Sequence, residues 1–85
     1  MSLATRTFPA ALRSRISLEA EADLGVTGRL LDLLVARDSL PQKMDLLRDG
    51  RTMTVTMEMA GGVEVDAGLL AQMREIPGVR AAGTL

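Results

Sequence analysis

The strictest pattern in the sequence is an alternation of apolar and polar side chains that runs from Thr52 to Met59. Successive side chains of a β-strand point to opposite faces of the sheet, so this period of two predicts a strand with one buried face. Most of the apolar positions are methionines, which fill irregular core spaces and also serve adaptable interfaces. The period explains them as core residues, and we therefore expect Met53, Met57 and Met59 to be buried.

Three other segments are predicted to be strands. From Arg15 to Asp23, apolar residues occupy every second position. Residues 43–49 also alternate, and they lead into Asp49-Gly50, a dipeptide that supplies the positive φ of a tight hairpin turn. A short last strand is predicted near the end of the chain, with one face formed by Val79, Ala81 and Leu85.

Two segments have the helical period instead. The first helix is predicted over about 26–38, and the second is predicted to begin after an N-cap at Asp66 and to end near Ile76. Each helix has an apolar stripe. The stripes consist of Val26, Leu30, Leu33 and Leu34 in the first helix and of Leu69, Leu70, Met73 and Ile76 in the second.

The order of the predicted elements is βαββαβ, which is the order of a ferredoxin-like α+β fold. We expect a four-stranded antiparallel sheet with two helices on one face, because nothing else in so short a chain could cover the apolar strand faces. Residues 14–85 would form this single domain, and residues 1–13 an N-terminal extension, disordered or partly derived from cloning. The uncovered face of the sheet would carry Ser17, Glu19, Glu21, Thr54, Thr56 and Glu58.

The residue types present restrict the chemistry. The chain has no histidine and no cysteine, which removes the usual general acid–base group, thiolate catalysis, disulfides and zinc–thiolate sites. Glu19 and Glu21 would lie ~7 Å apart on one strand face, but a solvated face explains them better than paired catalytic carboxylates. Lys43, the sole lysine, has no sequence neighbours that would favour Schiff-base chemistry, and Asp45 and Asp49 lack the spacing of a calcium loop. We therefore expect no catalytic residues, no metal and no cofactor.

The charge balance argues against polyanionic partners. Ten Lys/Arg residues against eleven Asp/Glu residues give a net charge of −1, which predicts no binding to nucleic acid or to an anionic membrane surface.

Apolar stretches such as Leu30 to Ala36 are far shorter than the ~20 residues of a membrane-spanning helix, and the absence of cysteine favours a cytoplasmic protein. A domain of this length buries only ~60–65% of its unfolded surface, so we expect it to gain stability from a partner surface.

The segment Gly25-Val26-Thr27-Gly28 is the best candidate for a ligand site. Glycines at a strand-to-helix turn let backbone N–H groups approach a ligand, and the helix dipole favours an anionic group there. The segment lacks both the full GxGxxG and the Walker pattern of nucleotide sites, and it differs from the KH-domain GxxG because it follows a strand in an acidic chain. Two interpretations stay open, a site for a small anionic ligand such as a carboxylate, or glycines that only permit a tight turn and close helix packing.

The run Asp23-Leu24-Gly25-Val26-Thr27-Gly28-Arg29-Leu30-Leu31, which opens a helix after a strand, resembles the start of an ACT domain. The strongest resemblance is to the small regulatory subunit of acetolactate synthase (acetohydroxyacid synthase). There, Gly, two further residues and a Ser-Arg-Val run occupy the places of Gly25 to Leu30. The resemblance extends through Ala36-Arg37 and through Leu70 to Val79, and it covers about 15–85.

This resemblance implies a dimer with an amino acid bound between the two chains. One chain would contribute its first strand-to-helix turn and the other the start of its second strand, which implies a site made of Asp23, Leu24, Gly25 and Val26 with Leu40 and Pro41. Feedback-sensitive small subunits carry an Asn where this chain has Ala22 and an Asn-Ile pair where it has Leu40-Pro41. Because both side-chain amides are replaced, the resemblance favours the short, valine-insensitive type of accessory subunit.

The leading hypothesis from the sequence is a non-catalytic regulatory or accessory subunit in branched-chain amino acid biosynthesis. It would dimerise, bind the catalytic subunit of acetolactate synthase and stabilise that subunit's active conformation. The alternative is a free-standing ACT module that binds a small amino acid effector and regulates another metabolic enzyme. A structural protein without a ligand is a third class. An enzyme is the least favoured, since a candidate nucleophile such as Thr27 has no imidazole to activate it.

Overall fold

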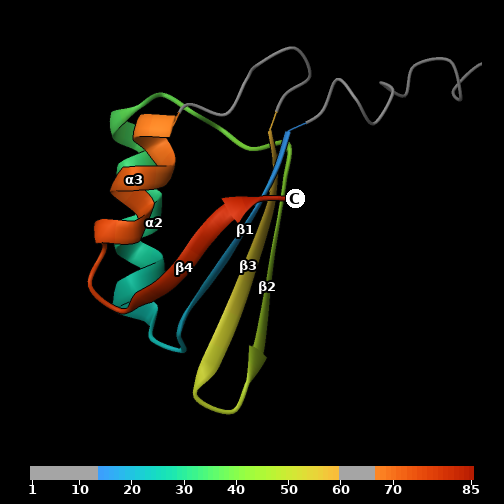
Figure 1. The fold of residues 1–85 in the computed structure, drawn as a ribbon, viewed down its shortest axis with the longest axis vertical. Helices are drawn as coiled ribbons and strands as arrows, with labels where there is room; N and C mark the ends of the chain where they lie inside the picture. The colour runs from blue at the N-terminus through green and yellow to red at the C-terminus, as the bar shows by residue number, and fades with distance from the viewer. Residues whose placement is uncertain (1–13, 60–66) are drawn as a thin grey trace, which may run out of the picture.

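The structure, a computed structural model, describes residues 14–59 and 67–85 of the chain. Its elements follow the predicted βαββαβ order (Figure 1). The predicted extension 1–13 and the predicted N-cap Asp66 lie outside the described residues. The elements are β1 (Ser14–Glu21), α2 (Leu24–Ala36), β2 (Lys43–Asp49), β3 (Thr52–Met59), α3 (Ala67–Glu75) and β4 (Val79–Thr84).

The four strands form one antiparallel sheet in the order β2-β3-β1-β4. Both helices lie on the same side of this sheet, as Figure 1 shows. The predicted ferredoxin-like α+β fold is therefore confirmed. Two central strands, β1 and β3, are bordered by β4 on one edge and by β2 on the other.

The core lies between the helices and the inner faces of β1 and β3. Along β3, buried and partly buried residues alternate without exception, so the burial of Met53, Met57 and Met59 is confirmed. Their partners in the core come from four other elements and from the turn that follows α3. These partners are Ile16, Leu18 and Ala20 of β1, Val26, Leu30 and Leu34 of α2, Leu69 and Met73 of α3, Ile76, and Ala82 of β4.

The first helix spans residues 24–36, so both predicted ends, 26 and 38, were two residues too late. It begins earlier because the Asp23 carboxylate caps it, accepting a hydrogen bond from the Gly25 N–H at 2.7 Å. It ends earlier because Asp38 adopts a left-handed backbone conformation with φ +52°. Neither α2 nor α3, the two helices of the described residues, is long and apolar enough to cross a membrane.

The predicted facing of the last strand was right at Val79, which packs against the core, but wrong at Ala81 and Leu85. Ala82 rather than Ala81 is the buried residue of β4, and Leu85 is 72% exposed. The cause is an irregularity in the pairing of β1 with β4, where Ala20 opposes Val79 but Glu19 opposes Ala81. The extra residue shifts the facing of the strand by one position.

The hairpin from β2 to β3 has the predicted turn, with Gly50 at φ +65°. In contrast to β3, strand β2 is exposed along its whole length except at Met44, which is partly buried. Leu46 opposes the buried Val55 and so faces the helix side, yet it remains 48% exposed. The helix layer therefore does not extend over this edge of the sheet.

Candidate functional site

Two hollows lie along the side of α2 that faces β2. The first, here named the N-terminal cavity, has a volume of about 120 Å³. Its walls come from the β1–α2 connection, the first turn of α2, and strands β2 and β3. They consist of Ala22, Asp23, Leu24, Thr27, Leu46, Arg48 and Met53.

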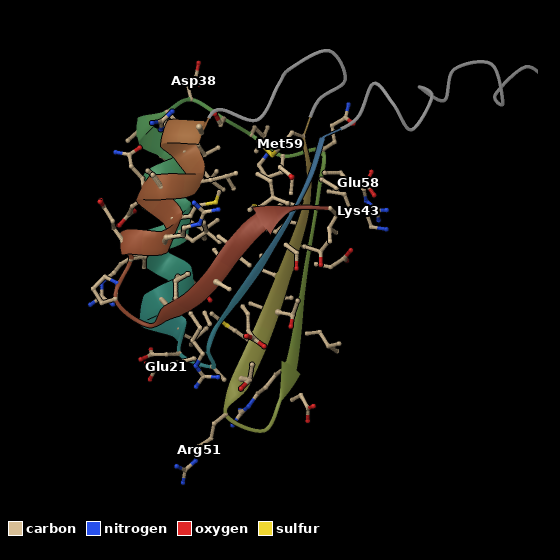
Figure 2. All side chains as sticks on the ribbon, in the orientation of Figure 1. Glu21, Asp38, Lys43, Arg51, Glu58 and Met59 are labelled. Atoms are coloured by element: carbon tan, nitrogen blue, oxygen red, sulfur yellow. The ribbon has the colours of Figure 1, made fainter. Side chains whose placement is uncertain are left out.

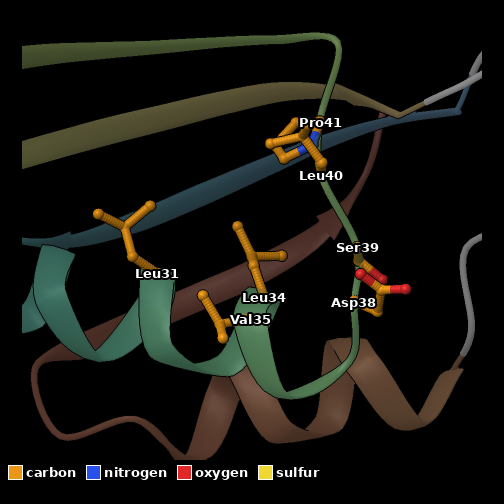
Figure 3. Close-up of a pocket in the computed structure, with 7 residues that line it drawn as sticks. All are labelled: Leu31, Leu34, Val35, Asp38, Ser39, Leu40 and Pro41. Carbon is orange, nitrogen blue, oxygen red and sulfur yellow. The ribbon is translucent and has the colours of Figure 1, made fainter.

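The second hollow, here named the C-terminal groove, is larger, at about 460 Å³. It lies between the end of α2 and the connection to β2 (Figure 3). Its lining is mainly apolar, with one carboxylate and one hydroxyl, and that hydroxyl already contacts the Arg37 carbonyl at 3.3 Å. The lining residues are Leu31, Leu34, Val35, Asp38, Ser39, Leu40 and Pro41.

The residues predicted for the site are divided between these hollows. Asp23 and Leu24 line the N-terminal cavity, and Leu40 and Pro41 line the C-terminal groove. A helix of 13 residues is roughly 20 Å long, so the two pairs are at opposite ends of α2 and do not meet within one chain. A site that combines them requires two chains and stays a prediction.

Gly25 and Val26 lie in the first turn of α2 rather than in a loop. The Gly25 N–H donates to the Asp23 carboxylate at 2.7 Å, and the Val26 N–H donates to the Asp23 carbonyl at 3.1 Å. Both amides that the sequence analysis assigned to a ligand carboxylate therefore have partners within the chain. An anion would have to displace Asp23, whose negative charge already complements the positive end of the helix dipole.

The glycines of this segment are not required by the backbone. Neither Gly25 nor Gly28 has a positive φ. A Cβ on Gly28 would have no neighbour within 4 Å, and one on Gly25 would lie 3.2 Å from the Asp23 carboxylate oxygen. Gly28 therefore makes neither the tight turn nor the close helix packing that the second interpretation proposed.

Arg48 is a lining residue of the N-terminal cavity that the sequence analysis missed. Its Nε donates to the Gly50 carbonyl at 2.8 Å, which anchors the guanidinium next to the hairpin. A guanidinium has five N–H groups in a rigid fork, so the terminal nitrogens remain to bind an anion. The period of β2 places Arg48 and Leu46 on one face, but only the fold places that face beside the start of α2.

Asp23 and Arg48 give the N-terminal cavity one negative and one positive side chain within mainly apolar walls. A carboxylate has about four lone-pair positions, so Asp23 can cap α2 and still accept a bond from an ammonium group. A space of this size equals roughly four water molecules at ~30 Å³ each. Within the described residues, no group of three or more acidic side chains could hold a metal ion.

Comparison with known proteins supports the fold. No protein-family model matches the sequence, and no curated protein matches it in sequence. Among solved structures, the ACT domain from GTP pyrophosphokinase of Chlorobium tepidum superposes with a TM-score of 0.72 at 17% identity, covering 87% of this chain and 97% of that domain.

Two further structures have the same fold. The C-terminal domain of the MgtC protein from Mycobacterium tuberculosis gives a TM-score of 0.67 at 15% identity, with 93% of this chain and 92% of that domain covered. A formyltetrahydrofolate deformylase from Pseudomonas putida KT2440 gives 0.64 at 16% identity, with 86% of this chain but only 28% of that one covered. The chain therefore has the fold of an ACT domain, and identities this low carry no conclusion beyond the fold.

Proposed function

We propose that this chain is a non-catalytic, ACT-type regulatory module that binds a small zwitterionic amino acid in the N-terminal cavity. The observation that carries the proposal is the pairing of Asp23 and Arg48 on the walls of one small cavity. An α-ammonium group would bind the Asp23 carboxylate, and the α-carboxylate would bind the terminal nitrogens of Arg48, a pairing that guanidinium geometry favours.

The shape and polarity of the cavity support a small apolar side chain on the effector. Apart from the two charged residues and Thr27, the walls are apolar, and the Thr27 hydroxyl already contacts the Met53 sulfur at 3.7 Å. Small-molecule sites commonly combine an apolar lining with a few polar groups that fix orientation. The sequence resemblance to ACT domains across residues 23–31 supports the same class of ligand.

A second, more specific proposal is that the module is an accessory subunit of acetolactate synthase that dimerises and binds its catalytic subunit. The motif around Gly25 and the replacements at Ala22 and Leu40-Pro41 support it, because they match the short, valine-insensitive subunits. In this case the module would act through protein contacts that stabilise the active conformation of its partner. The exposed apolar C-terminal groove is available for such contacts.

The first proposal is tested by isothermal titration calorimetry of the full chain against each of the twenty amino acids. We expect saturable binding of a small apolar amino acid, weakened about tenfold or more by Arg48→Ala because a charge-assisted pair is lost. Arg80→Ala serves as the matched control, since Arg80 is an exposed arginine on the opposite edge strand. Heats of dilution alone with all twenty amino acids at millimolar concentration would refute amino-acid binding.

The second proposal is tested by mixing the chain with a catalytic subunit of acetolactate synthase from the same source and measuring co-elution and synthase activity. We expect a complex and a higher activity. Separate elution with unchanged activity would refute the synthase assignment. Amino-acid binding without a synthase complex would identify the free-standing module instead.

A further inference from the structure

The C-terminal groove has a buried floor and an exposed apolar rim. Leu34, at 5% exposure, forms part of the floor, whereas Val35 is 78% exposed and Leu40 is 87% exposed. Figure 3 shows the side chains of Leu31 and Leu34 extending from α2 toward the connection to β2. The volume of about 460 Å³ is within the range of roughly 300–1,000 Å³ that is usual for ligand sites. A hollow with such a rim is a surface for another apolar group.

The start of the described chain lies at the same end of the molecule as this groove. Strand β1 begins at Ser14, which opposes Met59, the last residue of β3. Gln42, which directly precedes β2, donates its N–H to the Glu58 carbonyl at 2.7 Å. Only β3 separates β1 from β2, so the starts of these two strands are roughly 10 Å apart. The connection that lines the groove leads into β2 at this end.

We propose that residues 6–12 of this chain dock in its own C-terminal groove, with Phe8 as the anchor. Phe8 is the only aromatic residue of the chain, and it precedes Ser14 by six residues. Six residues span up to ~20 Å, which is enough to cross from β1 to the groove. The residues that follow Phe8 are also apolar, and removing them from water favours docking. They are Pro9, Ala10, Ala11 and Leu12.

The proline lowers the entropic cost of docking. Pro9 has a fixed φ, and a residue that precedes a proline is restricted to extended conformations. Phe8 and Pro9 therefore lose less conformational freedom on binding than two unrestricted residues would, and such restriction favours binding.

The charges of the segment and the groove are complementary. Residues 1–13 contain two arginines and no acidic residue, a charge of +2, so the rest of the chain carries −3 of the total of −1. Asp38 is the one charged residue of the groove lining, and it is exposed. Arg6 is two residues from Phe8, so its guanidinium would pair with the Asp38 carboxylate when the ring is docked. An exposed ion pair adds little affinity, and it acts mainly on specificity.

The covalent connection favours this segment over a separate peptide or a second copy of the chain. A short tether holds a segment at a millimolar effective concentration, so weak apolar contacts are sufficient for occupancy. This inference goes beyond the proposed function and does not depend on it. A partner protein that used the groove would first have to displace residues 6–12.

Docking is tested by the fluorescence of a single introduced tryptophan, since the chain has no tryptophan or tyrosine. In Phe8→Trp the indole would lie in the groove. In Ser2→Trp, outside the docked residues, it would stay in water. We expect the constant for quenching by acrylamide to be about threefold or more lower in Phe8→Trp, because it averages over docked and free populations. Equal quenching constants in the two variants would overturn the proposal.

Arginine substitutions then locate the protected indole. Val35→Arg or Leu40→Arg, added to Phe8→Trp, would place a bulky cation at the rim of the groove and should raise the quenching constant to the value of Ser2→Trp. Leu47→Arg is the matched control, since Leu47 is a 70% exposed leucine outside the groove lining, and it should leave the constant unchanged. Circular dichroism checks that each variant is folded. Protection that survives both rim substitutions, or that Leu47→Arg removes equally, would contradict docking in the groove.

The charge pairing is tested by Asp38→Asn, because asparagine tolerates the left-handed backbone of this position, φ +52°. This substitution should raise the quenching constant of Phe8→Trp about twofold, as expected for an exposed ion pair. An unchanged constant would refute the pairing of Arg6 with Asp38.

Protein concentration distinguishes the chain's own segment from that of a second copy. The quenching constant of Phe8→Trp should be the same at about 2 µM and about 100 µM, because docking within one chain is independent of concentration. Protection at the higher concentration alone would assign the docked segment to a second copy and would overturn the proposal.

Discussion

Replacement of Gly78 by alanine should destabilise the fold more than any other glycine-to-alanine change in the described residues. Gly78 has φ +98°, and a Cβ built on it would lie 2.6 Å from the Val26 Cγ2 atom. A left-handed backbone costs a non-glycine residue about 1–2 kcal/mol, and overpacking of a filled core costs a further 1–3 kcal/mol or so. We therefore expect Gly78→Ala to lower the free energy of unfolding by about 2–5 kcal/mol.

The position allows little relief of this clash. Val26 is 2% exposed, and the Gly78 carbonyl accepts a hydrogen bond from the Glu21 N–H at 2.9 Å, so both sides are held. When Val26 is also replaced by alanine, the destabilisation of Gly78→Ala that comes from the clash should disappear, while the destabilisation that comes from the left-handed backbone should remain. The double variant should therefore be more stable than the sum of the single effects predicts, by about 1–3 kcal/mol.

The assay is urea denaturation followed by far-ultraviolet circular dichroism, because the chain has no tryptophan or tyrosine for fluorescence. Protein concentration must be the same throughout, since association stabilises a folded chain by mass action. Gly28→Ala is the matched control. Its Cβ would meet nothing within 4 Å, and alanine is about 0.8–1.0 kcal/mol better than glycine inside a helix, so this variant should be more stable than the unmodified chain. Equal stability of the two variants would refute the reasoning.

Three further predictions use the same assay. Asp23→Ala should lower the free energy of unfolding by about 1 kcal/mol because it removes the N-cap of α2, whereas Asp23→Asn should lower it much less, since asparagine also caps helices. Equal losses in the two variants would contradict the capping role of Asp23. Met57→Ala should lower the free energy of unfolding by about 2–5 kcal/mol, since the Met57 side chain is fully buried. Leu85→Ala should change it by no more than about 0.5 kcal/mol, because Leu85 is 72% exposed. If the two substitutions cost the same, the observed packing of Met57 in the core would be contradicted. Arg80→Ala should change stability by less than about 1 kcal/mol, because its 2.7 Å bond to Thr52 is exposed; a larger loss would disqualify it as a control.

Local periodicity explains why the fold could be predicted. The alternation from Thr52 to Met59 and the stripe from Val26 to Leu34 each record which side of an element is buried, and burial is the main term in folding. The sequence predictions were wrong where the pairing with a neighbouring strand decides which residues are buried. Ala82 replaces Ala81 in the core because of an irregularity against β1, and no pattern within a six-residue strand reveals that shift.

The candidate site was predictable only in part. The sequence located one wall, at Asp23 and Leu24, since a strand-to-helix change of period is a local signal. It assigned the Gly25 amide to a ligand, although the neighbouring carboxylate occupies that amide in the fold. Arg48 was missed because it lies far from Asp23 along the chain, beyond the reach of any helical or strand period.

The sequence by itself determined the elements, their order and the inner face of β3, because these depend on side-chain patterns within a few residues. It also shows that this chain contains no histidine and no cysteine, so it supplies neither an imidazole nor a thiolate. The tertiary structure alone decided that Asp23 and Arg48 line one cavity and that β2 stands at an open edge. Both depend on which distant segments pack together, and that is settled by the burial of the whole core.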